Sequence, residues 1–204
     1  MSAVANPAKD TAAIFPSRFG SIINIDDVSS HLRIALESQK VPFSFPLPFR
    51  DRLGLFLGEY EPHFRGQFPQ PDVDSITVYP FCALPKDAQG DAFRFHARGS
   101  FHGHPKFSFF EAEGEDGESW FGQLWMLFQC QFQDVTLDLA LVSWLKDVPS
   151  VLYSTRKRTF TWNSLFADCV EVAHFIRPVT MLPSFVQRSK HTATVAATVY
   201  HLMD

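Results

Sequence analysis

The stretch WFGQLWMLFQCQFQDVTLDLALVSWL, residues 120–145, gives the clearest indication of the fold class. Its first half places apolar side chains at alternate positions, which is typical of a strand with one buried face. That face holds Trp120, Leu124, Met126, Phe128, Cys130 and Phe132, and the opposite one holds Gln123, Gln129, Gln131 and Gln133 with Trp125 and Leu127 among them. Residues 137–145, LDLALVSWL, are apolar on both faces, as expected of a central strand.

Further strands are predicted on both sides of this stretch. DSITVYPFCALP (74–85) predicts a strand broken at Pro80, because proline cannot donate to a strand ladder. FRFHARGSF (93–101) alternates phenylalanine with basic residues, and PKFSFFEAE (105–113) is the next strand, the chain reversing at residues 103–105. The remaining predicted strands are RTFTW (158–162) and CVEVAHFIRPVTML (169–182), which should stop near Pro178. TATVAATVYHL (192–202) is either a last strand or a docked arm. EGEDGE (113–118) predicts a solvated hairpin connection.

The N-terminal third differs from the rest of the chain. DDVSSHLRIALESQK (26–40) predicts a helix whose start is capped by Asp26 or Asp27. VPFSFPLPFR (41–50) should be extended because of its prolines, laying Phe43, Phe45 and Phe49 over a neighbour. DRLGLFLGEY (51–60) could form a short helix, but its two glycines lower the helix propensity and weaken this prediction. We therefore expect an N-terminal region, residues 1–69, packing on a β-rich domain at residues 70–204.

Composition restricts the function classes. The 204 residues include 22 Phe, most of which should be core, and three cysteines without close pairing, which suggest free thiols in a reducing compartment. The net charge of −4 argues against a dedicated phosphate-tracking surface but permits a local basic stripe. No apolar run approaches membrane-spanning length, so we expect no membrane partner. Gly-rich phosphate loops and nucleophile motifs are missing from the sequence.

The order of four segments resembles a known module. FHGHPKFSFFEAE (101–113), WFGQLWMLFQCQF (120–132), LDLALVSWL (137–145) and CVEVAHFIRPVTMLPSF (169–185) follow one another as in a domain of fungal transposon proteins of the Kyakuja–Dileera–Zisupton type. The same order resembles a bromo-adjacent homology (BAH) domain, whose Val-x-Trp-Phe strand is matched by Val142, Ser143, Trp144 and Leu145.

That resemblance implies a fold and a function. The fold would be mainly β, a small barrel-like or twisted antiparallel sheet with an N-terminal helix. The function would be a non-catalytic interaction module, associated with chromatin or nucleic acid, intracellular and nuclear, without a cofactor. Its partners would be a protein or histone peptide, or DNA, within a larger assembly, and Trp120, Trp144 and Tyr153 would bind a peptide through their aromatic rings. Core packing is the simpler interpretation of Trp144.

Two segments could contact nucleic acid. Arg94, His96 and Arg98 share one face of a predicted strand, and Arg156, Lys157 and Arg158 precede RTFTW. Basic residues interleaved with aromatic ones suit phosphate contacts combined with base stacking. The simpler interpretation of either group is a charged strand edge that prevents edge-to-edge pairing.

A metal-dependent enzyme is the alternative. His102 and His104 have the His-x-His spacing of cupin-like metal sites, Glu111 follows, and His174 lies downstream. Against this, Gly103 and Pro105 break the strand where the two imidazoles would need to be fixed. A solvated turn between strands explains the same residues without a metal.

Overall fold

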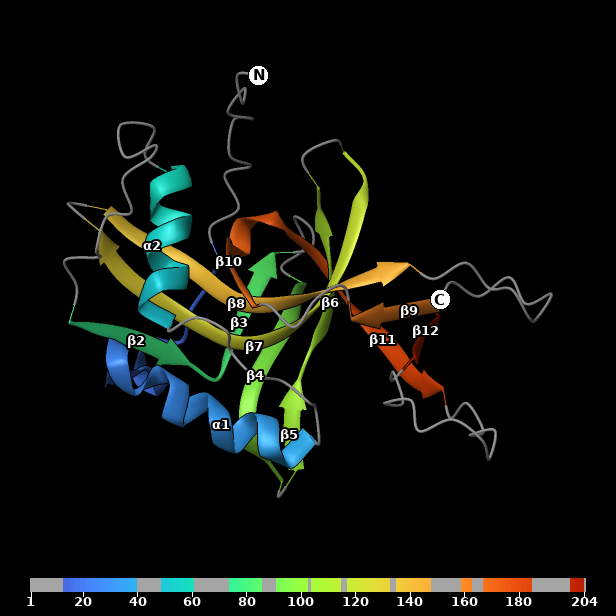
Figure 1. The fold of residues 1–204 in the computed structure, drawn as a ribbon, viewed down its shortest axis with the longest axis horizontal. Helices are drawn as coiled ribbons and strands as arrows, with labels where there is room; N and C mark the ends of the chain where they lie inside the picture. Colours follow the sequence, from blue (N-terminus) through green and yellow to red (C-terminus); the bar gives the residue numbers. More distant parts are fainter. Residues whose placement is uncertain are drawn as a thin grey trace.

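Antiparallel strands make up most of the described chain, and the protein is mainly β with helices near its N-terminus (Figure 1). The computed structural model describes residues 13–39, 49–60, 74–85, 91–102, 104–114, 117–132, 135–147, 159–162, 167–184 and 199–203. The helices are α1 (Val28–Gln39) and α2 (Phe49–Tyr60), with short 3-10 turns η1 (Ser17–Phe19), η2 (Ile25–Asp27) and η4 (Val172–His174). The strands are β1 (Ser21–Asn24), β2 (Ser75–Tyr79), β3 (Phe81–Pro85), β4 (Ala92–Phe101), β5 (His104–Phe107), β6 (Phe109–Glu113), β7 (Ser119–Phe132), β8 (Val135–Asp147), β9 (Thr159–Trp162), β10 (Asp168–Glu171), β11 (Phe175–Ser184) and β12 (Val199–Met203).

The strands form two sheets. The larger has nine strands in the order β1-β2-β7-β6-β11-β12-β9-β8-β10, and β7 also pairs directly with β8. This second pairing links β7, β6, β11, β12, β9 and β8 in a ring. β9 contributes only two or three residue pairs to each of its neighbours. The sheet is therefore strongly curled and barrel-like without being a full-length closed barrel.

The long β7–β8 pair lies at the centre of the core. Leu137, Leu139 and Leu141 of β8 pack on one side, whereas Ala140 and Val142 pack on the other. Both faces of β8 are thus buried, which confirms its prediction as a central strand. On the first side, α1 and α2 bury Val28, Leu32, Leu53 and Leu57 against the sheet; Figure 1 shows α2 crossing β7 and β8.

A bulge in β7 changes which residues share a face. Leu124 pairs with Val142 but Met126 pairs with Leu141, so Trp125 is an extra residue in the ladder. Leu124 and Leu127 consequently pack in one cluster, while Trp125, Met126 and Phe128 pack in the other. The prediction that Leu124 and Met126 share a face is wrong for this reason, because one inserted residue reverses the alternation.

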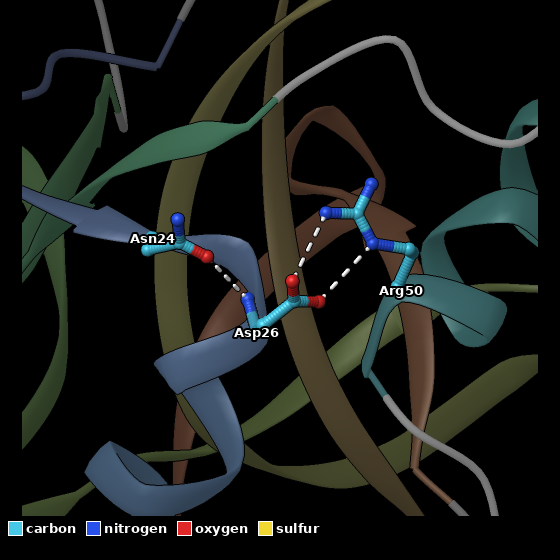
Figure 2. Close-up of polar contacts among 3 residues, drawn as sticks. All are labelled: Asn24, Asp26 and Arg50. Carbon is cyan, nitrogen blue, oxygen red and sulfur yellow. Dashed lines mark hydrogen bonds and ion pairs between the residues drawn. The ribbon is translucent and has the colours of Figure 1, made fainter.

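Two details of the helical region were not predicted. The side chain that caps the turn before α1 is that of Asn24, whose Oδ1 accepts a 2.9 Å hydrogen bond from the backbone N–H of Asp26. The Asp26 carboxylate accepts a hydrogen bond of 3.2 Å from Arg50 Nε at the start of α2 (Figure 2). Phe49 is not part of an extended segment but begins α2, where it is buried against Phe128. Phe43 and Phe45 lie outside the described residues.

Three strand boundaries also differ from those predicted. The chain reverses earlier than residues 103–105, because Phe101 of β4 already pairs with His104 of β5, and His102 between them has a φ of 51°. Ser108 separates β5 from β6, so PKFSFFEAE forms two strands. Pro178 does not end β11, which continues to Ser184. Pro178 pairs with Phe110, and a register shift near Phe175 precedes it.

Candidate basic and aromatic surface

The three-stranded sheet β3-β4-β5 directs basic side chains away from the core. Phe95 of β4 and Cys82 of β3 are fully buried, so the residues on either side of them in each strand point outward. The register places Phe81 beside His96, Ala83 beside Arg94 and Arg98 beside Lys106. Arg94 and Lys106 are exposed, and Arg98 and His96 are half-buried.

Aromatic rings lie among these cations. The guanidinium of Arg98 lies 5.0 Å from the centre of the Phe81 ring, and that ring is 6.0 Å from the imidazole of His96. The ring of Phe19 in η1 is 5.9 Å from that of Phe81, and the Arg18 guanidinium lies 5.1 Å from the centre of the Phe19 ring. We call this group the outer basic–aromatic surface. Its residues are Arg18, Phe19, Phe81, Arg94, His96, Arg98 and Lys106.

Two segments far apart in sequence build this surface. Ile14 bridges Ala83 with backbone hydrogen bonds of 2.8 and 3.1 Å, which fixes the N-terminal segment along β3. Phe15 packs inward against Tyr79, and the chain then turns through η1. Arg18 and Phe19 are thereby brought beside Phe81, an arrangement that no local sequence pattern indicates.

The electrostatic environment of His96 reflects its neighbours. Burial lowers the pKa of His96 to about 4, and the nearby charges of Lys106, Arg98 and Arg94 act in the same direction. Its imidazole is therefore neutral at physiological pH and presents an uncharged ring. The backbone N–H of His96 donates to Ser108 Oγ at 2.9 Å, and its carbonyl accepts from Ser108 N–H at 2.9 Å, which anchors this part of β4.

Among the outward-facing residues of this sheet whose side chains are described, none is acidic. They are Phe81, Ala83, Pro85, Ala92, Arg94, His96, Arg98 and Lys106. The outer basic–aromatic surface is consequently a local concentration of positive charge on a chain whose net charge is −4. Such a surface favours an anionic ligand, and its rings offer flat apolar contacts.

The sequence predicted part of this surface. Arg94, His96 and Arg98 do share the outward face of β4. Lys106 was missed, although the alternation around the buried Phe107 indicates that it points outward. Arg18, Phe19 and Phe81 were also missed, because their contacts depend on tertiary structure. The second basic group, Arg156, Lys157 and Arg158, lies outside the described residues.

A second aromatic feature combines two of the residues predicted to bind a peptide. The rings of Trp120 and Trp144 meet edge to face at 5.4 Å, and Phe110 lies 5.6 Å from Trp144. Trp120 is 42% exposed, whereas Trp144 is half-buried against the core. Trp144 also donates a hydrogen bond to Asp168, whose pKa is raised by burial despite this bond and the nearby charge of Arg52. Tyr153, the third predicted residue, lies outside the described part of the chain.

The described residues of the alternative metal site, His102, Glu111 and His174, have surroundings unlike those of metal ligands. Glu111 on β6 accepts hydrogen bonds of 2.7 Å from Arg177 Nε and 2.6 Å from Ser119 Oγ, so its carboxylate is engaged in the sheet. His102 lies exposed at the β4–β5 turn, and His174 lies in η4, 3.7 Å from Glu171. The side chain of His104 is not described. Within the described residues, no three His, Cys, Asp or Glu side chains gather as metal ligands would.

The three cysteines are buried and unbridged. Burial raises the pKa of Cys82 to about 12 and that of Cys130 to about 11, and it raises the pKa of Cys169 further. A reactive cysteine needs a thiolate, and these three are kept as thiols. They act as core side chains.

The chain matches no protein-family model, and comparisons with curated proteins and with solved structures find no similar protein. Neither α1 nor α2, the helices of the described segments, is long and apolar enough to cross a membrane.

Proposed function

We propose that this protein is a non-catalytic interaction module that binds nucleic acid through the outer basic–aromatic surface. The observation that supports this most directly is the gathering of four cations, Arg18, Arg94, Arg98 and Lys106, around the rings of Phe19, Phe81 and His96. A BAH-like, transposon-derived module acting on chromatin in the nucleus is the setting that the sequence resemblance implies. Nucleic acid is the ligand that matches the chemistry of this surface.

The charge distribution determines how such binding would behave. A net charge of −4 disfavours long-range attraction of a polyanion, so affinity depends on contacts within the surface itself. Each phosphate neutralised contributes about −0.7 to −0.9 to the slope of log affinity against log salt concentration. Four cations therefore give a slope of about −3.

The first experiment measures binding of fluorescently labelled DNA and RNA by anisotropy. We expect the double variant Arg94→Gln with Lys106→Gln to bind more weakly than the unmodified protein, because both side chains are exposed cations of this surface. Lys146→Gln is the matched control, since Lys146 is an exposed strand cation on β8. Absence of binding at micromolar concentrations, or an equal loss in the control, would contradict the proposal.

A second candidate function is peptide binding at the Trp120–Trp144 pair. The exposed ring of Trp120 in this edge-to-face pair favours it, because a cationic side chain gains about 0.5–2 kcal/mol over an indole face. The resemblance to BAH domains implies a histone tail as the peptide. Trp120→Ala should abolish binding to an array of histone peptides while the thermal unfolding midpoint stays nearly unchanged. If that variant binds peptides normally, the pair is a packing feature only.

A further inference from the structure

Three rings of the outer basic–aromatic surface are neighbours in succession, and we call them the aromatic row. Phe19 of η1 is 5.9 Å from Phe81 of β3, which is 6.0 Å from His96 of β4, and the ring planes are inclined by 50° and 42°. Each ring comes from a different element. Phe19 is 44% exposed and Phe81 is partly exposed. We propose that this row stacks the bases of single-stranded nucleic acid, an inference that rests on the proposed function.

The ring spacing favours a single strand over a duplex. Stacked bases of one duplex strand rise by about 3.4 Å, whereas neighbouring rings of the row are 5.9 and 6.0 Å apart. Bases placed on successive rings must therefore separate from one another. A single strand allows this separation because its bases are not held in pairs, and unstacked bases are the usual partners of aromatic side chains.

Cations neighbour the rings of the row. Arg18 and Arg98 each lie over one face of the Phe19 and Phe81 rings, at 5.1 and 5.0 Å from the ring centres, so a stacked base would take the other face of the ring or displace the guanidinium. Lys106 neighbours Arg98 across the β4–β5 pair, and Arg94 is two residues from His96 on β4. Positive charge thus accompanies every ring. Aromatic stacking platforms beside a positively charged track are the usual arrangement in proteins that bind single strands with little sequence preference.

The neutral state of His96 fits the same arrangement. Partial burial, assisted by three neighbouring cations, lowers the pKa of His96 and keeps its imidazole unprotonated at physiological pH. An uncharged ring offers its face to a base, whereas phosphate contacts fall to the permanently charged neighbours. The row therefore contains three stacking groups and the surface four phosphate-binding groups.

The test compares two probes on the full chain, a labelled oligothymidine of about ten nucleotides and a duplex of the same length. We expect the oligothymidine to bind more tightly. Phe19→Leu and Phe81→Leu keep apolar volume but remove the aromatic face, so each should weaken oligothymidine binding roughly five- to hundredfold. The salt dependence should be unchanged because no cation is removed. Val135→Ala, at an exposed apolar residue of β8 outside this surface, is the control and should bind normally.

The outcomes separate this inference from the proposed function. If both probes bind equally, the phenylalanine variants bind normally and the Arg94→Gln, Lys106→Gln protein binds weakly, the surface binds phosphates but stacks no bases. That result would overturn the single-strand inference and leave the proposed function standing. If neither probe binds, the proposed function fails. Phe19→Leu is the more informative variant, because Phe19 is exposed and its loss should not unfold the protein.

Discussion

At the scale of single residues, the pKa of His96 reflects first its burial and then the positive charges around it. Its pKa is lowered from 6.5 to about 4, so between these values the unfolded chain binds a proton that the folded chain does not. Stability contributed by this group is therefore complete above pH 6.5 and decreases as the pH falls toward 4. We expect NMR titration to give an acidic His96 pKa that rises in the Arg94→Gln, Lys106→Gln double variant. An ordinary histidine pKa would contradict the described surroundings.

Ser143 is a buried polar residue with a structural role. Its Oγ accepts a 2.9 Å hydrogen bond from the indole N–H of Trp125, the bulged residue of β7. Ser143→Ala removes this acceptor inside the core, which should lower the free energy of unfolding by about 1–3 kcal/mol. Urea denaturation measures the change. Thr136→Ala, which removes the exposed hydrogen bond to Gln131, is the control and should cost about 0.5 kcal/mol or less.

The sequence predicted the positions of some residues of the candidate sites but not the contacts of others. Strand alternation was sufficient to place Arg94, His96 and Arg98 on one outward face. It could not show that Arg18 and Phe19 meet Phe81, because that contact is made through the bridge between Ile14 and Ala83. The functional interpretation of the Trp120–Trp144 pair likewise needed the strand register, which brings two positions 24 residues apart to 5.4 Å.

At the scale of elements, β7 shows what alternation alone misses. Residues 124–128 are all apolar, so no polar residue shows which alternate positions share a face. The sequence therefore does not reveal the bulge. Trp125 is the extra residue, and beyond it the residues that alternation would assign to one face of the strand lie on the other. Helix α2 was underestimated for a related reason. Its glycines lower helix propensity, but Leu53 and Leu57 are fully buried, and tertiary packing outweighs propensity.

Gly122 allows three strands to pack closely. A Cβ at this position would lie 2.7 Å from the Phe110 ring and 3.0 Å from the Ser143 carbonyl oxygen. The Phe110 ring is itself stacked on Phe175 at 4.2 Å, so it has little room to move. Gly122→Ala should therefore destabilise the protein by about 1–3 kcal/mol, measured by thermal unfolding.

Gly114→Ala is the comparison for Gly122→Ala. The three atoms nearest to its added Cβ would all belong to the exposed Trp120 ring, with Nε1 at 2.5 Å, and that side chain can rotate away. The destabilisation should be smaller than for Gly122→Ala. Equal losses would mean that the β6–β7–β8 packing is looser than described.

At the scale of the whole molecule, the N-terminal helices share one core with the sheet. Leu53 and Leu57 of α2 are fully buried in the cluster that contains Phe128 and Leu139. Leu57→Ala should therefore lower the stability of the entire protein by about 2–5 kcal/mol in one cooperative transition. Far-UV circular dichroism and tryptophan fluorescence should give the same midpoint. Two separate transitions would instead support an independent unit at residues 70–204.

The overall composition was a weaker guide to function than the arrangement of charge. The chain as a whole has a net charge of −4, yet the β3-β4-β5 sheet gathers the positive charges of Arg94, Arg98 and Lys106 on one face. The sequence predicted a mainly β fold with an N-terminal helix, because periodicity of two dominates residues 75–182. It could not predict how the sheet returns to β8, since the β12–β9 pairing joins Tyr200 and His201 to Phe160 and Thr159, which are far apart in the sequence.

The salt dependence of oligothymidine binding tests the central claim most directly. For the unmodified protein, log affinity should fall with log salt concentration with a slope of about −3, because four cations contact phosphates. Removing two of those cations in the Arg94→Gln, Lys106→Gln protein should make the slope shallower by about 1.4. A slope that is the same in both proteins would contradict nucleic-acid binding by the outer basic–aromatic surface.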